Sequence, residues 1–365
     1  MALLETIREV ASLPQDRATT LPGRAYTDPE LFVRECDTVL ASGWHCLGRC
    51  DEIPNPGDYF TVDLLGEPLL IVRGDDGTIR VLSNLCRHRA MPLAEGKGTA
   101  EKFVCSYHAW SYARDGALRS AARMKGTALD AKNCRLPKFR SEEWRGFLYA
   151  SLDDDAPDLT PTLSALEPVI AAYHTEDFRV VHSAEEVWQT NWKCLVENFM
   201  EGYHLSVVHP VTLHGYTPTG LSKKFEGGEG FTGYHAKYPS SIPPRGAGHA
   251  DLTAEQRHRS SLFCVYPCQV VSQAANLLVS LSLQPLTAAS VRVKWTLSVW
   301  EDELDEDAIA ERIELWNEVN REDREKLERL QLTLGARKAD PGPLAPSDYE
   351  GTIHDFHGYL AKALK

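Results

Sequence analysis

The sequence predicts an α+β protein with two domains, and three observations support this prediction. The chain has 365 residues, which is more than a single hydrophobic core usually serves. Residues 44–152 consist of short β-like runs separated by turns, a pattern typical of a small antiparallel β domain. Residues 1–43 and 153–365 instead combine helical periodicity with longer strands, so we assign both segments to a second domain.

Local signals define the elements of the N-terminal segment and the β domain. Residues 1–43 are expected to be largely helical, and Asp28-Pro29 marks the start of one helix. Gly74-Asp75-Asp76-Gly77 predicts a hairpin, and the aspartates before Pro157 mark the end of the domain. The clearest strand-like runs are 59–62, 69–73, 79–82 and 147–150.

Helices and strands alternate after this boundary. The pattern predicts a helix over 162–173 and strands over 178–187, 269–283 and 290–300. Residues 215–260 are rich in Gly, Pro and Ser, so we expect a long, partly mobile loop near the functional site. A short helix from about Tyr349 is expected to end the chain.

A long helix is predicted over 306–334, and its apolar stripe contains two polar residues. Steps of three and four connect Ile309, Ile313, Trp316, Asn320, Asp323, Leu327, Leu330 and Leu334. A carboxylate on a buried stripe is costly unless it is paired or binds a metal, so Asp323 is either a buried ion pair or a metal ligand. The neighbouring acids Glu322, Glu325 and Glu328 fall off the stripe and are interpreted as a solvated face.

Composition and charge exclude several classes of protein. A net charge of −13 argues against nucleic acid as a partner, because no basic face is available to neutralise phosphates. No run of about 18 apolar residues occurs, and no basic region precedes a hydrophobic one at the N-terminus, so we expect a cytoplasmic protein. The odd number of nine cysteines argues against a disulfide framework.

Residues 191–210 hold a group of residues able to bind metal near a helix end. Glu201 and His204 are three residues apart and share one face of a regular helix. His209 lies five residues beyond His204, a spacing that a regular helix would splay by about 140°. The two imidazoles therefore converge only if the helix ends or deforms, and Pro210 favours such an ending.

Two half-motifs in the β domain each contain one cysteine and one histidine. Cys86-Arg87-His88 is followed after sixteen residues by Cys105-Ser106-Tyr107-His108. Two thiolates and two imidazoles can hold zinc or a two-iron cluster. The predicted hairpin ends and the one-Cys, one-His composition of each half favour a Rieske [2Fe-2S] arrangement, with a zinc knuckle as the alternative.

Taken together, these motifs resemble the oxygenase (α) subunit of Rieske non-haem iron oxygenases over nearly the whole chain. The matching segments are Gly57-Asp58-Tyr59, Asn84 to Arg89, Cys105 to Trp110, Asn191-Trp192-Lys193 and Glu201 to Pro210. The resemblance implies a Rieske domain over 44–152. It also implies a catalytic domain, formed by 1–43 and 153–365, with a twisted antiparallel sheet flanked by helices.

The resemblance also assigns roles to individual residues. Cys86, His88, Cys105 and His108 would hold the [2Fe-2S] cluster. His204, His209 and Asp323 would bind a mononuclear Fe(II), a two-histidine, one-carboxylate triad that leaves positions open for O2.

Glu201 corresponds to a carboxylate that links the two metal sites in this family. It would lie between the Rieske histidine of one subunit and an iron-binding histidine of its neighbour, which implies a homotrimer. Family members often have Asp here, and Glu is similar to the carnitine, choline and glycine-betaine monooxygenase branch. Glu197 and Asn198 are candidates for groups that support the ligands.

The expected activity is that of a terminal oxygenase supplied with electrons from NAD(P)H by a separate flavin- or ferredoxin-type reductase. The substrate would be a small organic molecule, such as a betaine-like quaternary amine that is hydroxylated or oxidatively demethylated. An aromatic cage would bind such a cation, and its candidate residues, which also suit ordinary packing, are Tyr203, Tyr216, Phe263 and Tyr266. Oxygenation or O-demethylation of an aromatic acid is the alternative, and a Rieske electron-transfer or zinc-binding protein would be another class.

Overall fold

The computed structural model describes residues 2–300 and 304–364, and these form two compact units. One unit is Leu47–Ala156, and the other joins Met1–Cys46 to Pro157–Lys365. We describe each unit by itself. Within the described ranges, none of the helices combines the length and the apolar composition needed to cross a membrane.

The smaller unit is built from short antiparallel strands. One sheet has the order β4-β3-β2-β5, a second contains β1, β10 and β9, and a third contains β6, β7 and β8. The predicted hairpin joins β3 to β4, and Gly77 adopts a φ of +78° in its turn. The bounds of the strands are β1 His45–Arg49, β2 Asp58–Leu64, β3 Glu67–Arg73, β4 Ile79–Ser83, β5 Lys97–Thr99, β6 Phe103–Val104, β7 Ser111–Tyr112, β8 Leu118–Ser120, β9 Arg140–Trp144 and β10 Phe147–Ser151.

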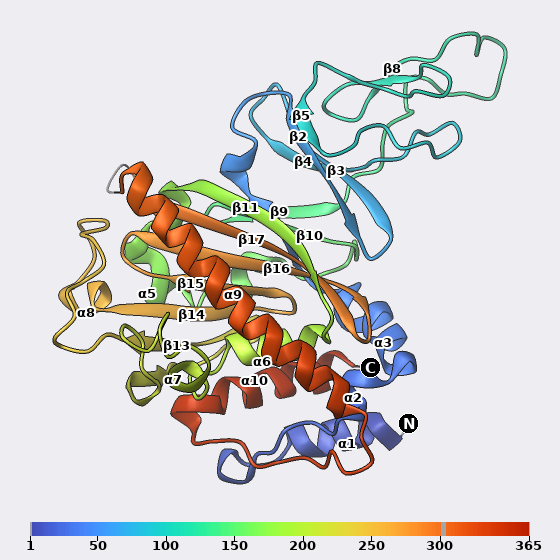
Figure 1. Cartoon of the computed structure of the whole chain (residues 1–365). Helices are drawn as coiled ribbons and strands as arrows, with labels where there is room; N and C mark the ends of the chain where they lie inside the picture. Colours follow the sequence, from blue (N-terminus) through green and yellow to red (C-terminus); the bar gives the residue numbers. More distant parts are fainter. Residues whose placement is uncertain (1, 301–303, 365) are drawn as a thin grey trace. The chain divides into compact units, whose positions relative to one another are not determined.

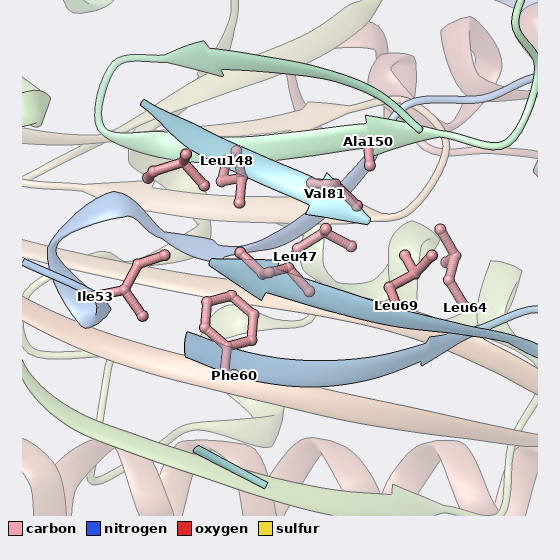
Figure 2. Packing of buried hydrophobic residues seen from close by; sticks show 10 residues of the cluster. Leu47, Ile53, Phe60, Leu64, Leu69, Val81, Leu148 and Ala150 are labelled. Atoms are coloured by element: carbon pink, nitrogen blue, oxygen red, sulfur yellow. The ribbon is translucent and has the colours of Figure 1, made fainter. Parts of the chain in front are cut away.

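Two hydrophobic clusters of buried side chains stabilise this unit. Figure 2 shows the first cluster, in which side chains from β2, β3 and β4 pack against those from β10. The second cluster contains Cys86 and Cys105 beside Trp110 and Tyr112. The two half-motifs are therefore anchored in a hydrophobic core by their cysteines.

A seven-stranded antiparallel sheet forms the centre of the larger unit, with the order β11-β17-β16-β15-β14-β13-β12. Tyr234 of β13 pairs with Leu262 of β14, and His182 of β11 pairs with Leu297 of β17. Side chains alternate between the two faces of such a sheet. The bounds are β11 Phe178–Trp188, β12 Ser222–Lys224, β13 Phe231–Lys237, β14 Arg259–Val265, β15 Gln269–Gln273, β16 Leu277–Thr287 and β17 Ser290–Trp300.

Helices cover this sheet, and the longest of them is α9, Glu306–Leu334, as the sequence predicted. α9 crosses one face of the sheet (Figure 1), where Arg324 pairs with Glu186 of β11 at 3.2 Å. Trp316, Asn320, Asp323 and Leu327 are buried on α9, but Leu330 is 44% exposed, so the buried stripe is shorter than predicted.

The N-terminal helices also belong to the larger unit. Asp28 caps α3 by accepting hydrogen bonds from the backbone of Glu30 and Leu31, which confirms the predicted helix start. The helices are α1 Ala2–Ala11, α2 Arg24–Thr27, α3 Pro29–Glu35, α4 Leu159–Thr162, α5 Glu167–Ile170, α6 Trp192–Phe199, α7 Leu205–Val208, α8 Ala254–Arg257 and α10 Ser347–Ala363. A π-helical turn over Cys36–Leu40 follows α3.

Several predicted elements were wrong. The expected loop over 215–260 contains β12, β13 and α8, because pairing with β14 stabilises a strand whose own sequence has little periodicity. The expected strand over 269–283 is a hairpin of β15 and β16. The helix over 162–173 is broken into short turns, and α10 is a full helix of 17 residues rather than a short one.

Candidate metal centres

His204, His209 and Asp323 lie together in the larger unit. α6 ends at Phe199, and a one-turn helix, α7, begins after His204 and ends before His209. The longer helix thus ends before the first histidine, and the two histidines cap opposite ends of α7, so the break lies before His204 and not between the two histidines as expected. Nε2 of His209 is 3.1 Å from Oδ1 of Asp323, and Nε2 of His204 is 3.7 Å from the same oxygen.

The chemistry of these three side chains fits a divalent metal ion. One ligand atom from each residue lies within 4.8 Å of the other two. His209 is 1% exposed and Asp323 is 7% exposed, and Nε2 of His209 has no hydrogen-bond partner among the described residues. A buried imidazole nitrogen facing a carboxylate without a hydrogen bond is typical of a metal ligand.

A carboxylate contacts Nδ1 of each imidazole, on the side opposite Nε2. Nδ1 of His204 donates to Glu201, which also accepts a hydrogen bond of 3.1 Å from the backbone nitrogen of His204. Nδ1 of His209 donates to Oε2 of Glu322 at 2.7 Å, and the hydroxyl of Thr212 donates to the same oxygen. Because each Nδ1 is used in this way, each Nε2 is left for a metal.

The role of Glu322 corrects the interpretation of that residue as part of a solvated face. Its side chain is 15% exposed and supports a predicted ligand. Glu325 pairs with Arg321, as expected of an acid on the outer face of a helix. Glu328 pairs with Arg324 but also accepts a hydrogen bond of 2.9 Å from the backbone nitrogen of Gln189, directly after β11, so it too departs from the solvated-face interpretation. One step along a helix separates Glu322 from Asp323, so sequence periodicity alone could not distinguish a partly buried support from an exposed acid.

Burial and charge act in opposite directions on His204. Burial lowers the pKa of His204, but the carboxylates of Glu201 and Asp323 outweigh it, and the net pKa is raised. The site is thus a region of negative potential that favours a cation.

Of the two residues expected to support the ligands, Asn198 contacts one of them: its Nδ2 donates to Asp323 at 3.3 Å. Glu197 instead forms hydrogen bonds with Tyr26 and His357.

The smaller unit brings the four predicted cluster ligands together. Nδ1 of His88 is 3.2 Å from Nδ1 of His108, and the two cysteines are buried while the two histidines are exposed. Ala90 and Ala109, each four residues after its cysteine, both adopt a left-handed φ, of 56° and 58°. The two half-motifs therefore have the same backbone shape.

The electrostatics of these loops suit thiolate ligands. Burial raises the pKa of Cys105, but hydrogen bonds from the backbone N–H groups of Tyr107 and His108, and from Cys86, outweigh burial. The net pKa of Cys105 is therefore lowered. The hydroxyl of Tyr112 lies 3.4 Å from Sγ of Cys86. Two adjacent buried thiols and two adjacent exposed imidazoles fit a Rieske cluster, with Cys₂ on one iron and His₂ on the other.

The four predicted aromatic substrate contacts lie in different surroundings. Tyr203 is 58% exposed, and Tyr266 stacks on Tyr359 of α10 with ring centroids 4.4 Å apart. Phe263 follows Leu262 in β14, so it points to the sheet face opposite Tyr234. Tyr216 is covered by the guanidinium of Arg245, at 3.7 Å from the ring centroid.

Comparison with known families gives two matches. Residues 173–365, more than half of the chain, match the family of the ring hydroxylating alpha subunit (catalytic domain). Residues 43–139 match the Rieske [2Fe-2S] domain. The two matched segments contain all the predicted metal ligands.

Two curated relatives are similar over part of the chain. The glycine betaine monooxygenase oxygenase subunit of Chromohalobacter salexigens is 36% identical over 196 residues, covering 53% of this chain and 44% of that protein. The carnitine monooxygenase oxygenase subunit of Escherichia coli K12 is 34% identical over 201 residues, covering 54% of each. The aligned part of the chain thus spans about half the length of these relatives.

The fold is shared with a solved structure. The quaternary ammonium Rieske monooxygenase CntA, in complex with substrate γ-butyrobetaine, superposes with a TM-score of 0.84 at 24% identity. The superposition covers 98% of this chain and 99% of the other. At this identity the likeness establishes the α+β fold, which confirms the predicted fold class.

Proposed function

The chain belongs to the family of ring-hydroxylating alpha subunits that carry a Rieske [2Fe-2S] domain, and on this premise we propose that it is the terminal oxygenase of a multicomponent system. Its reaction would insert oxygen from O2 into a small organic substrate, with electrons from NAD(P)H delivered by a separate reductase. The observation that carries this proposal is the triad of His204, His209 and Asp323, with two imidazoles and one carboxylate within 4.8 Å.

Two separate sets of residues would bind the two metal groups that such a reaction needs. His204, His209 and Asp323 would hold the mononuclear iron, and Cys86, His88, Cys105 and His108 would hold the cluster. When bound, these groups would supply oxygen activation and single-electron transfer, respectively. Glu201 and Glu322 keep the two imidazoles in the tautomer that presents Nε2 to the metal.

Glu201 is also proposed to link the two metal sites between subunits. One of its carboxylate oxygens accepts the hydrogen bond from Nδ1 of His204, and its side chain remains 11% exposed. In a homotrimer, the cluster histidine of a neighbouring subunit would contact this carboxylate. Such a hydrogen-bonded path would connect the two centres without large movements of either.

The substrate class that we favour is a betaine-like quaternary amine, which would be hydroxylated or oxidatively demethylated. Support comes from the two relatives, whose names give glycine betaine and carnitine as their substrates. Oxygenation or O-demethylation of an aromatic acid remains the second candidate, because Arg245 already covers the ring of Tyr216 and Tyr266 stacks on Tyr359.

The test is substrate-dependent oxygen uptake by the iron-loaded protein with a reductase and NADH, comparing betaines with methoxylated aromatic acids. Product analysis should find a hydroxylated or demethylated product in amounts that match the oxygen consumed. Iron and acid-labile sulfide analysis separates the other classes. Zinc without sulfide would contradict an oxygenase, and two irons with no mononuclear site would leave only an electron-transfer protein.

A further inference from the structure

Arg245 is an unpaired cation held between aromatic rings in the larger unit. Its guanidinium lies 3.7 Å from the ring centroid of Tyr216 and 6.0 Å from that of Tyr238. Nε and Nη2 of Arg245 are both buried and have no hydrogen-bond partner among residues 2–300 and 304–364. Tyr216 and Tyr238 thus orient the guanidinium and leave two of its donor atoms unused.

One side of α9 presents a row of further unused donors. Arg312, Trp316 and Asn320 follow one another at four-residue intervals, so their side chains lie along one side of the helix. Nε of Arg312, Nε1 of Trp316 and Nδ2 of Asn320 are each buried without a hydrogen-bond partner in the described parts of the chain. The next turn of α9 carries Asp323.

Tyr238 lies beside the guanidinium of Arg245, with 6.0 Å between the guanidinium and the ring centroid, and its hydroxyl also senses the charge of Arg312. The charge of Arg312 acts on Arg245, and both guanidiniums act on the hydroxyl of Tyr238, which is 5% exposed. Within 2–300 and 304–364, neither arginine forms an ion pair or a side-chain hydrogen bond. Partly buried cations without an acceptor are costly, and an anion that contacted both arginines would remove that cost.

We propose that Arg245 and Arg312 bind the carboxylate of the substrate, an inference that rests on the proposed oxygenase function. All five unpartnered atoms, from Arg245, Arg312, Trp316 and Asn320, are donors, so they select a ligand rich in acceptors. Arginine is suited to this role because its planar fork matches a carboxylate. A guanidinium already occupies one face of Tyr216, so this face is not available to a quaternary ammonium group.

The spacing along two elements indicates a substrate of elongated shape. Eleven residues of α9 separate Arg312 from Asp323, which is about 16 Å along the helix axis. A second measure comes from Tyr234 and Tyr238. Tyr234 donates to the backbone of Glu201, near the proposed iron site, and Tyr238 lies beside Arg245. Four residues of extended chain, about 13 Å, separate the two tyrosines. The carboxylate would therefore bind at the end of the substrate that is distant from the reacting carbon.

The test measures ligand binding to the iron-loaded protein without reductase, so that it does not depend on turnover. Each carboxylate is matched with a ligand that lacks the carboxylate: 4-methoxybenzoate with 4-methoxybenzamide, and γ-butyrobetaine with choline. The first pair represents aromatic acids and the second represents betaines. In at least one pair, the carboxylate should bind tenfold to a hundredfold more tightly (an order-of-magnitude expectation for a charged hydrogen bond).

Substitution of the arginines should remove this preference. Arg245→Gln and Arg312→Gln should each weaken binding of the carboxylate about tenfold or more, with little effect on its matched partner. Arg245→Lys should restore part of the affinity because it keeps the charge. Arg321→Gln is the control, since Arg321 lies on the exposed side of α9, paired with Glu318 and Glu325. Cluster absorbance and iron content verify that each variant is folded.

The outcomes separate this inference from the proposed function. Binding of neither carboxylate, or an equal loss for both members of a pair, would overturn the inference and show that water satisfies the buried donors. Glycine betaine binding as tightly as γ-butyrobetaine would contradict the elongated shape. Arginine-dependent binding of a carboxylate that is never oxidised would instead count against the proposed function alone.

Discussion

Nε2 of His209 lies 3.1 Å from Oδ1 of Asp323, although more than a hundred residues separate the two in the chain. His209 ends the one-turn helix α7, and Asp323 is on the buried side of α9. A neighbour supports each side chain: Glu322 holds His209, and Asn198, a candidate from the sequence, donates to Asp323. The predictions below test these contacts.

Asp323→Ala should abolish substrate oxidation and remove the mononuclear iron, because a two-histidine site lacks the carboxylate ligand. Total iron should fall from about three to about two per chain, with the Rieske absorption unchanged. Iron analysis and absorption spectroscopy measure both. Glu325→Ala, an exposed change on the same helix, is the control, and wild-type turnover by Asp323→Ala would remove this residue from the site.

Glu201→Gln should leave both metal groups bound but slow electron transfer between them about tenfold or more. The amide keeps the size of the side chain but is neutral, so it accepts the hydrogen bond from Nδ1 of His204 less strongly. Stopped-flow oxidation of the reduced cluster in the presence of O2 and substrate follows this step. The exposed Glu229→Gln is the matched control, and an unchanged rate in Glu201→Gln would rule out the proposed link.

Glu322→Ala should weaken mononuclear iron binding by about 10-fold to 100-fold, because His209 loses the carboxylate that orients it. Activity should return when excess Fe(II) is added, since the ligands themselves remain. Glu322→Gln should be less impaired because its amide oxygen still accepts from Nδ1. Iron affinity equal to that of Glu325→Ala would show that Glu322 is only a surface acid.

His235 should make stability depend on pH. Burial first, and the nearby charge of Arg259 second, lower the pKa of His235 from 6.5 to about 4. The unfolded chain therefore binds more protons between these values, so the free energy of unfolding falls as pH decreases from 6.5 to 4. After allowance for partial exposure of the ring, the expected loss is about 2 kcal/mol.

Chemical denaturation of the wild type and of His235→Gln at pH 7 and pH 4.5 measures this effect. The wild type should lose more stability than the variant over this interval, because only the wild type carries the group with the lowered pKa. Comparing the two proteins removes the pH dependence of the metal ligands, which they share. Equal losses would show that His235 does not contribute.

The sequence was sufficient for the chemistry of the metal centres. Two half-motifs that each join a cysteine to a histidine predicted a metal cluster, and the resemblance that they carried is confirmed by the family matches over 43–139 and 173–365. Asp323 could be singled out because helical periodicity is a local property, and a carboxylate on a buried stripe conflicts with it. The bounds of α9 followed from the same periodicity.

Long-range contacts were beyond such reasoning. β13 has weak periodicity of its own, and its strand conformation is stabilised by hydrogen bonds to β14. Glu322 was assigned to the solvated face because periodicity cannot resolve a side chain at the edge of a buried stripe. The surroundings of the aromatic candidates were likewise out of reach, since residue type does not reveal that Arg245 covers Tyr216.

The sequence by itself therefore predicted the metal ligands and determined the bounds of the helix that carries Asp323. The tertiary structure alone decided which acid supports His209, which strands form the sheet, and which donors of Arg245 and Arg312 are buried without a partner in the described parts of the chain. The physical reason is that ligand chemistry and helical period are encoded within a few residues. Hydrogen-bond partners, burial and local charge arise only when distant segments pack together.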